Sequence, residues 1–251
     1  MRSVFLTGTA RESSLEYLLK NREEIIAVIT PRLSDNNHRF EKVIYTAVKF
    51  GVPVVPVKKN EVTATLKKIE YDLLISCGFS FVLEREAIEN SKYAINSHPT
   101  LLPKYRGYRS GPYIIINGET ESGVTVHLLT DEMDKGDIIM QSKFNVSPFD
   151  TTKSLYFKAR EIEGKLLFDS IQLLKTGKIN RIKQDETKAT TFNILRTPDD
   201  SLIDWNKPLK DLYNEIRACD PEDYPAYFFV ENQKVCIKLW RPEKSQEKFE
   251  L

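Results

Sequence analysis

The sequence predicts an α/β fold in which a mostly parallel sheet is followed by a small C-terminal α+β annex. In the first half, short β-branched runs alternate with longer stretches of helical spacing, which is typical of βαβ units. After about residue 188 the pattern changes, because prolines stand at positions 198, 208, 221, 225 and 242 and both tryptophans lie there. With 251 residues, 41% of them hydrophobic, the chain can form one large domain and a smaller one.

Seven apolar runs carry the strand signal of the predicted sheet. They are SVFLTG (3–8), IIAVIT (25–30), VPVVPV (52–57), DLLISCG (72–78), YAINSH (93–98), GVTVHLLT (123–130) and DIIMQSKFNV (137–146). Stretches of helical spacing separate the first four runs, at residues 14–21, 41–51 and 61–70. A mostly parallel sheet with helices between its strands is Rossmann-like, and this is the architecture that we expect for the core.

A long amphipathic helix is predicted over residues 151–177. Its apolar residues recur at spacings near 3.6, at Leu155, Ala159, Ile162, Leu166, Ile171 and Leu174. This helix closes the first predicted domain, the catalytic core of residues 1–180. Residues 188–251 form the annex, in which AYFFV and KVCIKLWR flank the polar turn ENQK and predict a β-hairpin.

Charge and cysteine content exclude several classes of function. The 37 basic residues nearly balance the 36 acidic ones, so we expect no nucleic-acid partner. No run approaches the roughly 20 apolar residues of a membrane span, so we expect no membrane partner and a cytoplasmic location. Cys77, Cys219 and Cys236 lie far apart, which suits a reducing compartment and predicts no metal site. The first strand-to-helix turn, FLTGTARESS, lacks the GxGxxG of dinucleotide sites.

Two polar side chains stand at the end of the strand YAINSH. Because side chains alternate along a strand, Asn96 and His98 share one face with Ala94, while Ile95 and Ser97 share the other. Ligands of open parallel sheets bind at the carboxyl ends of the strands. A neutral amide donor beside an imidazole can face oxyanion charge next to a proton acceptor, so the pair predicts a catalytic site.

A histidine base works better with a carboxylate that orients it and stabilises its cation. The cluster TDEMDKGD follows the next strand and offers Asp131, Glu132, Asp134 and Asp137. Spacing alone does not choose among these four, and a solvated turn is the alternative interpretation. His127, in the middle of the strand GVTVHLLT, is interpreted as a satisfied core residue.

Four motifs follow one another between residues 96 and 137: Asn-x-His, Leu-Leu-Pro with a following Arg-Gly, a Gly-Val-Thr strand, and Asp-x-Gly-Asp. In this order and spacing the segment closely resembles the formyltransferase superfamily that uses N10-formyltetrahydrofolate. The resemblance implies a catalytic triad of Asn96, His98 and Asp134, with N10-formyltetrahydrofolate as co-substrate. It also implies that Asn96 donates to a tetrahedral oxyanion, that His98 accepts the amine's proton or stabilises the oxyanion as imidazolium, and that Asp134 pairs with the imidazole.

The segment after the core separates the branches of this superfamily. Its RTPDDSLIDW and the following helix are similar to methionyl-tRNA formyltransferases and to sugar N-formyltransferases. The tRNA enzymes carry a larger, basic C-terminal domain, whereas the net charge here is +1. The resemblance therefore implies formylation of a 3- or 4-amino deoxysugar linked to a nucleotide, usually dTDP, for surface polysaccharide such as the O-antigen of lipopolysaccharide.

Three other functions stay open as alternatives. The first is formylation of methionyl-tRNA or of another acceptor. The second is hydrolysis of formyltetrahydrofolate by the same triad with water as nucleophile; such hydrolases resemble this core preceded by a small regulatory domain, whereas MRSVFLTG begins the first strand directly. The third is non-catalytic binding of folate or nucleotide, which gives no reason to desolvate an Asn, a His and an Asp together.

The resemblance also assigns binding residues. For the pterin these are Gly78, Phe79, Ser80, Phe81, Leu83, Leu129, Thr130, Asp131 and Glu132. For the sugar nucleotide, the segment PKYRGYRSG itself offers Lys104, Arg106 and Arg109 to a pyrophosphate and Tyr105 or Tyr108 to a base or sugar. The resemblance adds Arg196, Asp204 and Trp205 at the same cleft. Core packing is the alternative role for the two phenylalanines and for Trp205, and bracing of its own loop is the alternative for Arg106.

The predicted hairpin bears on whether the protein forms an oligomer. An isolated hairpin is marginal in water, and so much apolar surface on a small annex needs a cover. Sugar N-formyltransferases commonly dimerise through C-terminal strands, so the resemblance implies a homodimer with this hairpin near the two-fold axis. The alternative is a hairpin that folds back on its own core.

Overall fold

The computed structural model describes residues 1–32, 39–108, 110–192, 197–219 and 224–242. The chain divides into two compact units, each built from three stretches of sequence. The first unit comprises Met1–His98, Val124–Ser142 and Arg160–Thr187, and the second comprises Pro99–Gly123, Lys143–Ala159 and Lys188–Leu251. The predicted division into residues 1–180 and 188–251 stays a prediction.

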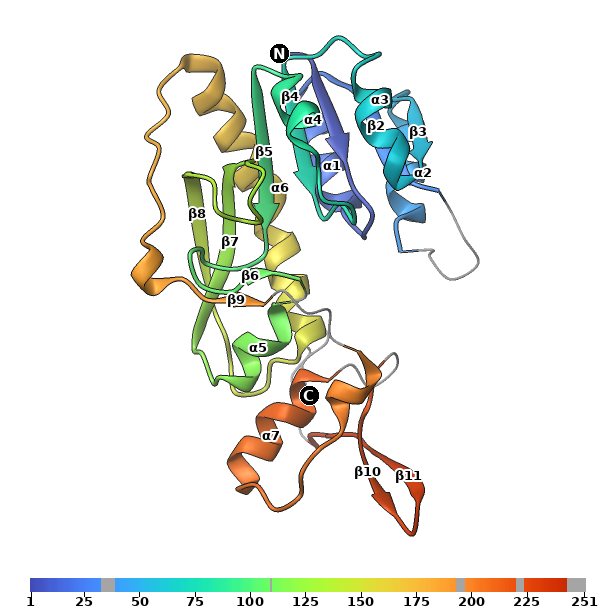
Figure 1. Cartoon of the computed structure of the whole chain (residues 1–251), viewed down its shortest axis with the longest axis vertical. Coiled ribbons are helices and arrows are strands. Elements are labelled where there is room, and N and C mark those ends of the chain that lie inside the picture. The colour runs from blue at the N-terminus through green and yellow to red at the C-terminus, as the bar shows by residue number, and fades with distance from the viewer. Residues whose placement is uncertain (33–38, 109, 193–196, 220–223, 243–251) are drawn as a thin grey trace. The chain divides into compact units, whose positions relative to one another are not determined.

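A seven-stranded sheet forms the centre of the fold (Figure 1). Its strands are β1 (Ser3–Leu6), β2 (Ile25–Pro31), β3 (Val54–Val57), β4 (Leu73–Cys77), β5 (Tyr93–His98), β7 (Glu121–Leu128) and β8 (Ile138–Asn145), in the order β3-β2-β1-β4-β5-β7-β8. The first five pair in parallel, and β7 runs antiparallel to β5. All seven strands were predicted, and the α/β, mostly parallel architecture is confirmed.

Helices lie between the parallel strands. They are α1 (Glu12–Lys20), α2 (Glu41–Lys49), η1 (Lys59–Glu61), α3 (Val62–Leu66) and α4 (Arg85–Glu89). All but η1 and α4 fall largely in the stretches whose spacing predicted a helix. Val62 and Leu66 of α3 and Ala87 of α4 pack in one apolar cluster with the strand residues Leu6 and Leu74. Burial of such side chains typically contributes about 1.5–3 kcal/mol each, so packing on the sheet stabilises helices that are too short to persist alone.

The long helix α6 (Thr152–Thr176) lies within one residue of its predicted ends. Of its predicted apolar stripe, Leu155, Leu166 and Ile171 are buried, whereas Ile162 is only half-buried. The neighbouring Glu163 is buried instead, with 1% of its surface exposed. Gly164 explains the close approach of α1, because a Cβ there would lie 2.8 Å from Cβ of Tyr17.

The remaining elements lie in the second unit, except that η2 begins in the first. They are β6 (Arg106–Gly107), which pairs with β9 (Thr191–Phe192), α5 (Gly111–Ile116), η2 (Glu186–Lys188), η3 (Pro198–Ser201) and α7 (Leu209–Ala218). The helix α7 follows RTPDDSLIDW, where the resemblance implied a helix. The others were not predicted, because their hydrophobic patterns span too few residues to indicate helix or strand.

The predicted C-terminal hairpin is confirmed as β10 (Ala226–Val230) and β11 (Gln233–Ile237), which pair antiparallel. Its turn is two residues long, and both Glu231 and Asn232 have positive φ, as a type I′ turn requires. The inner face of the hairpin packs Ala226, Phe228 and Ile237 into a small apolar cluster with residues of α7. Within the described ranges, no helix is both long and apolar enough to span a membrane.

Candidate active site

The end of β5 turns its polar side chains to the two faces of the sheet, as strand alternation predicts. Asn96 and His98 lie on one face, and Ser97 lies on the other, where its hydroxyl donates to Glu163 (Oγ to Oε1, 2.8 Å). His98 is 6% exposed, so its imidazole sits in a largely water-excluded environment. This is the position at the carboxyl end of a parallel strand where ligands of such sheets bind.

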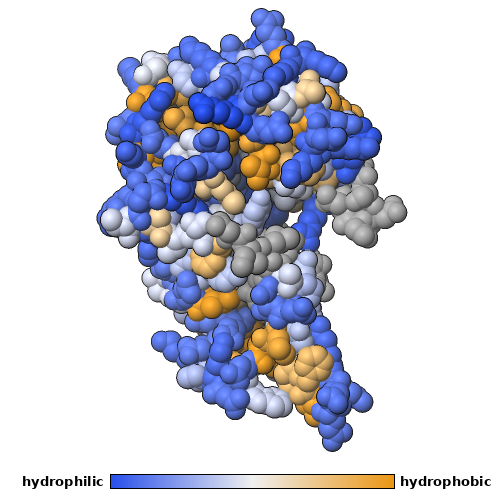
Figure 2. Space-filling view, viewed as in Figure 1, coloured by the Kyte–Doolittle hydropathy of each residue, from blue (hydrophilic) through white to orange (hydrophobic). Residues whose placement is uncertain are grey.

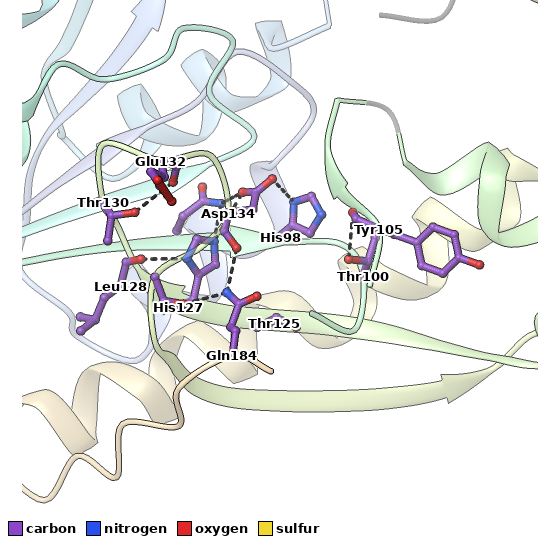
Figure 3. A network of polar contacts seen from close by, with 12 residues as sticks. His98, Thr100, Tyr105, Thr125, His127, Leu128, Thr130, Glu132, Asp134 and Gln184 are labelled. Carbon is purple, nitrogen blue, oxygen red and sulfur yellow. Dashed lines mark hydrogen bonds and ion pairs between the residues drawn. The ribbon is translucent and has the colours of Figure 1, made fainter. Parts of the chain in front are cut away.

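Asp134 is the carboxylate that meets both β5 side chains (Figure 3). Its Oδ2 lies 3.5 Å from Nδ1 of His98, and its Oδ1 accepts from the Asn96 amide at 3.4 Å. Of the three other candidates in the acidic cluster, Asp131 and Glu132 are exposed. The structure therefore brings together the three residues of the predicted triad, whose catalytic roles stay a prediction.

The turn that carries Asp134 has an unusual backbone. Asp134 is in the left-handed region with φ of +55°, which few non-glycine residues adopt. Two residues later, a Cβ on Gly136 would lie 1.8 Å from the carbonyl oxygen of Leu128, so only glycine fits there. These two features aim the Asp134 carboxylate back toward the end of β5.

His127 belongs to the same polar network, which the sequence interpretation as a core residue missed. It stands directly opposite Asn96 in the β5–β7 pairing, and Nε2 lies 3.1 Å from the Asn96 amide nitrogen. Nδ1 lies 2.8 Å from the carbonyl oxygen of Leu128 and therefore carries the proton. The lone pair on Nε2 then accepts from Asn96. His127 is indeed buried and satisfied, but its partner is a site residue.

A second buried network lies beneath β5. Glu163 accepts hydrogen bonds from Ser14 (2.7 Å) and Ser97 (2.8 Å) and pairs with Arg11 (Nε to Oε2, 3.0 Å). Burial, and next the Glu163 carboxylate, raise the pKa of the Cys77 thiol well above its ordinary value, so this cysteine is inert. The sequence does carry a signal for Glu163, because an acidic residue follows Ala159 by four positions in the apolar stripe of α6.

The residues predicted to bind the pterin gather along one edge of the first unit's core. Leu83 is buried, and Phe79, Phe81 and Leu129 pack half-buried against the same cluster. The rings of Phe79 and Phe81 meet edge to face, with centroids 5.3 Å apart. Gly78 has φ of +67°, and a Cβ there would meet Thr9 at 2.2 Å.

The remaining members of this predicted set are more open. Ser80, Thr130, Asp131 and Glu132 are exposed, and the Thr130 hydroxyl donates to the carbonyl of Glu132 at 2.9 Å. The two segments therefore offer an apolar wall and an exposed polar backbone turn, which is the combination that a fused aromatic ring with a polar edge requires.

The residues predicted to bind the sugar nucleotide fall in the second unit. Lys104 pairs with Glu119 (3.3 Å), and the Tyr105 hydroxyl donates to the same carboxylate at 2.8 Å. Burial raises the pKa of Tyr105 to about 12, so this phenol stays a donor at neutral pH. Arg106 is 1% exposed and its backbone pairs with Thr190, which fits the alternative role as a brace.

Other predicted contacts of the nucleotide differ in exposure. Tyr108 is 37% exposed, and Asp204 accepts from the backbone and side chain of Asn206. Trp205 is 57% exposed and stacks at a tilt on Phe228 of the hairpin, with ring centroids 5.1 Å apart. The predicted Arg109 and Arg196 lie outside the described residues.

Among the residues that the structure describes, no three His, Cys, Asp or Glu side chains gather in a way that could hold a metal ion. The end of β5 brings together an amide donor, an imidazole and a carboxylate. Together they can hold a proton and stabilise developing negative charge.

Comparison with known proteins points to one family. The profile of the family described as "Formyl transferase" matches residues 1–171, and that of "Formyl transferase, C-terminal domain" matches residues 196–250. Methionyl-tRNA formyltransferase of Fusobacterium nucleatum is 32% identical over 88% of this chain and 74% of its own length. The enzyme of the same name from a Geobacillus species is 33% identical over 92% of this chain and 74% of its own length.

Solved structures with the same fold include N-formyltransferases. A 4-N formyltransferase from Francisella tularensis superposes with a TM-score of 0.79 at 22% identity, over 95% of this chain and 96% of that one. The N-formyltransferase of Helicobacter canadensis, solved with folinic acid and dTDP-3-aminofucose, has a TM-score of 0.74 at 24% identity, over 93% of this chain and 85% of that one. The N-terminal family profile covers more than half of this chain, and the chain therefore belongs to the formyl transferase family.

Proposed function

We propose that this protein transfers a formyl group from N10-formyltetrahydrofolate to the amino group of a nucleotide-linked amino-deoxysugar, with dTDP as the nucleotide. The observation that carries the proposal is the convergence of Asn96, His98 and Asp134 at the end of β5, in a chain of the formyl transferase family. The product would serve surface polysaccharide synthesis. The free thiols Cys77, Cys219 and Cys236 support a cytoplasmic site of action.

His98 and Asp134 handle the proton in the proposed reaction. An amine that attacks a formyl carbonyl must lose a proton, and Nε2 of His98 is the acceptor. Nδ1 of His98 faces Asp134 Oδ2 at 3.5 Å, so Nδ1 carries the hydrogen in the neutral ring and Nε2 carries the lone pair. Asp134 then stabilises the imidazolium, which can return its proton to the leaving nitrogen.

Asn96 supplies the donor for developing negative charge. One of its N–H groups faces His127 Nε2 at 3.1 Å, and the other makes a long contact of 3.4 Å with Asp134. The longer contact is near the limit of a hydrogen bond, so an oxyanion can replace Asp134 as the acceptor of this N–H at little cost while His127 still holds the other N–H. A preorganised donor of this kind typically contributes about 10² to 10³ in rate.

The residues at the edge of the first unit fit the folate. Bound there, N10-formyltetrahydrofolate supplies the formyl group as an acyl donor. The half-buried rings of Phe79 and Phe81 and the side chain of Leu129 would hold the apolar faces of the pterin. Main-chain groups of residues 129–132 would recognise its polar edge. The H. canadensis enzyme, solved with folinic acid, supports a folate in this family.

The choice of a sugar nucleotide as acceptor rests on charge and on structural relatives. A net charge of +1 gives little field to attract a tRNA, whose binding depends on neutralised phosphates. A compact diphosphate needs only a few donors, and Lys104 and Tyr108 are exposed in the second unit to provide them. The two N-formyltransferases of solved structure named above, one of them solved with dTDP-3-aminofucose, match this chain over at least 85% of their length.

Methionyl-tRNA is the second candidate acceptor, because the curated relatives at 32–33% identity carry that name. Both acceptors present a primary amine and would use the same triad. They differ in what must be held beside it: a sugar diphosphate in one case and an acceptor stem in the other.

A panel of acceptors tests the proposal. Purified protein with N10-formyltetrahydrofolate is offered dTDP-, UDP- and GDP-linked 3- and 4-amino deoxysugars, methionyl-tRNA, or no acceptor. We expect a dTDP-amino sugar to gain the mass of one formyl group and to outpace every other acceptor. Formylation of methionyl-tRNA alone would establish the second candidate, and release of formate alone would establish a hydrolase.

A further inference from the structure

The backbone of Asp134 has a conformation that few residues other than glycine adopt. Its φ of +55° places it in the left-handed region, inside the turn that joins β7 to β8. Such residues persist when surrounding contacts over-determine them, and they cluster at functional sites. The contacts that hold this turn therefore decide where the Asp134 carboxylate points.

Gln184 makes those contacts (Figure 3). Its side-chain amide donates to the carbonyl oxygen of Asp134 at 2.7 Å and to that of Gly136 at 2.8 Å. The amide has two N–H groups and the turn presents two carbonyls on either side of Lys135, so one side chain spans the strained segment. Gln184 is 6% exposed, which keeps both hydrogen bonds out of competition with water.

The segment that carries Gln184 is itself anchored to the same turn. Ile182 exchanges two backbone hydrogen bonds with Ile138, at 2.8 and 2.9 Å, as an antiparallel bridge at the start of β8. The side chain of Gln184 is thus presented from a fixed backbone, two residues from the bridge. His98 and Gln184 approach Asp134 from different directions, one at the carboxylate and the other at the main chain (Figure 3).

We propose that Gln184 is a positioning residue that locks the Asp134 turn, so that the Asp134 carboxylate stays in register with His98 and Asn96. Both hydrogen bonds described above go to main-chain carbonyls of the turn, so Gln184 would act on the reaction through the position of Asp134. The inference rests on the proposed role of Asp134 in formyl transfer. No pattern in the sequence marks Gln184, since it lies fifty positions from its partner in a polar stretch.

The test is a cycle of variants at positions 184 and 134. Gln184→Met keeps the length and volume of the side chain but removes both donors. We expect kcat to fall by up to about 10²-fold, with KM for folate and acceptor changed by less than about twofold. In an Asp134→Asn background the same substitution should leave the residual kcat unchanged within about twofold, because Gln184 acts only through that carboxylate.

A matched control separates positioning from a general loss of packing. Gln172→Met makes the same substitution on α6, where the amide donates to Glu23 at 2.6 Å and is remote from the turn in sequence. It should leave kcat unchanged. If the double variant lost the full product of the two single-variant losses in kcat, the inference would be overturned. A Gln184→Met variant with the kcat of the parent would overturn it as well.

A second measurement does not depend on activity. The sequence has only three histidines, so the ring ¹⁵N signals of a histidine-labelled sample are few. In folded Gln184→Met we expect the His98 and His127 signals to move, because both rings lie within 3.6 Å of the Asp134 carboxylate. In Gln172→Met they should stay. Unmoved signals in Gln184→Met would overturn the inference, even if the parent protein formylated no acceptor and the proposed function failed.

Should Gln184→Met fail to fold, Gln184→Glu takes its place in both measurements. It keeps the shape but sets a carboxylate against two carbonyl oxygens, so the turn is released by repulsion rather than by a missing donor. The expected and contradicting results are the same.

Discussion

His127 Nε2 lies 3.1 Å from the side-chain nitrogen of Asn96, across the antiparallel pairing of β5 and β7. The carbonyl of Leu128 fixes the tautomer of the ring by accepting from Nδ1. Asn96 therefore has one N–H held by a buried neutral imidazole that is 1% exposed. This contact fixes the plane of the Asn96 amide, and with it the direction of the second N–H, which can then donate to a negatively charged oxygen.

Two substitutions at His127 test this orienting contact. His127→Gln retains an acceptor for Asn96, whereas His127→Leu removes it at similar size. We expect the leucine variant to lose about 10- to 100-fold in kcat with little change in KM, and the glutamine variant to lose less. Steady-state kinetics on folded protein would measure both. Equal activity of the leucine variant and the parent would show that Asn96 needs no such support.

The proposed triad makes a sharper prediction. His98→Asn and Asp134→Ala should fold normally and lose about 10² to 10⁴ in kcat, because each removes part of the proton-handling pair. Circular dichroism checks that the variants are folded, and turnover at saturating substrate concentrations measures the loss in kcat. A matched control is Glu161→Gln, an exposed acid of α6 with no proposed role in the site, which should retain the activity of the parent. Near-parental kcat in either triad variant contradicts the assignment.

The buried carboxylate of Glu163 should matter for stability. Its removal leaves Arg11 without its counter-charge and the hydroxyls of Ser14 and Ser97 without an acceptor. We expect Glu163→Ala to lower the free energy of unfolding by about 3–5 kcal/mol. The exposed neighbour Glu161→Ala should change it by less than about 0.5 kcal/mol. Urea titrations measure both values, and equal midpoints for the two variants would refute the role of this network.

Apolar surface gathers on the part of the chain that carries the β10–β11 hairpin (Figure 2). Phe229, Val230 and Val235 are 49%, 45% and 38% exposed, and Trp240 is 80% exposed. We propose that a second copy of the chain covers this surface in a homodimer, as the resemblance to sugar N-formyltransferases implies.

Light scattering at micromolar concentration tests the dimer. The parent should have twice the mass of one chain, and Val235→Glu should be monomeric, because a charge would be buried in the interface. Lys210→Glu changes an exposed residue of α7, outside the hairpin, and should remain dimeric. A monomeric parent, or a dimer that tolerates Val235→Glu, would exclude this interface.

The sequence alone predicts the site only where the relation between two residues depends on their separation along one strand or helix. Asn96 and His98 share a face because strand alternation is a local rule, so their juxtaposition follows from the sequence alone. Asp134 could not be chosen from its cluster by spacing, since a positive φ aims its side chain, and only the family resemblance singled it out. The register that sets His127 opposite Asn96 is a long-range property, which is why His127 was interpreted as core.

The same distinction applies to the fold. Seven strands and the long helix α6 were predicted because their hydrophobic patterns run over many residues. The two-residue strands β6 and β9 could not be, since each exists only by pairing with the other, eighty-five positions apart. Glu163 is a buried acid on the apolar face of α6, which its sequence position alone did not explain. Its burial is explained by its contacts with Ser97 and Arg11, which lie far away in the sequence.

Transfer of a labelled formyl group tests the central claim most directly. N10-formyltetrahydrofolate carrying ¹³C in the formyl carbon is mixed with the protein and a dTDP-linked amino-deoxysugar, and the label is followed by NMR. The account predicts a formamide carbon bonded to the sugar nitrogen, formed far faster than formate and lost in the His98→Asn variant. Label that appears only as formate, or a formamide that forms equally fast without His98, would contradict it.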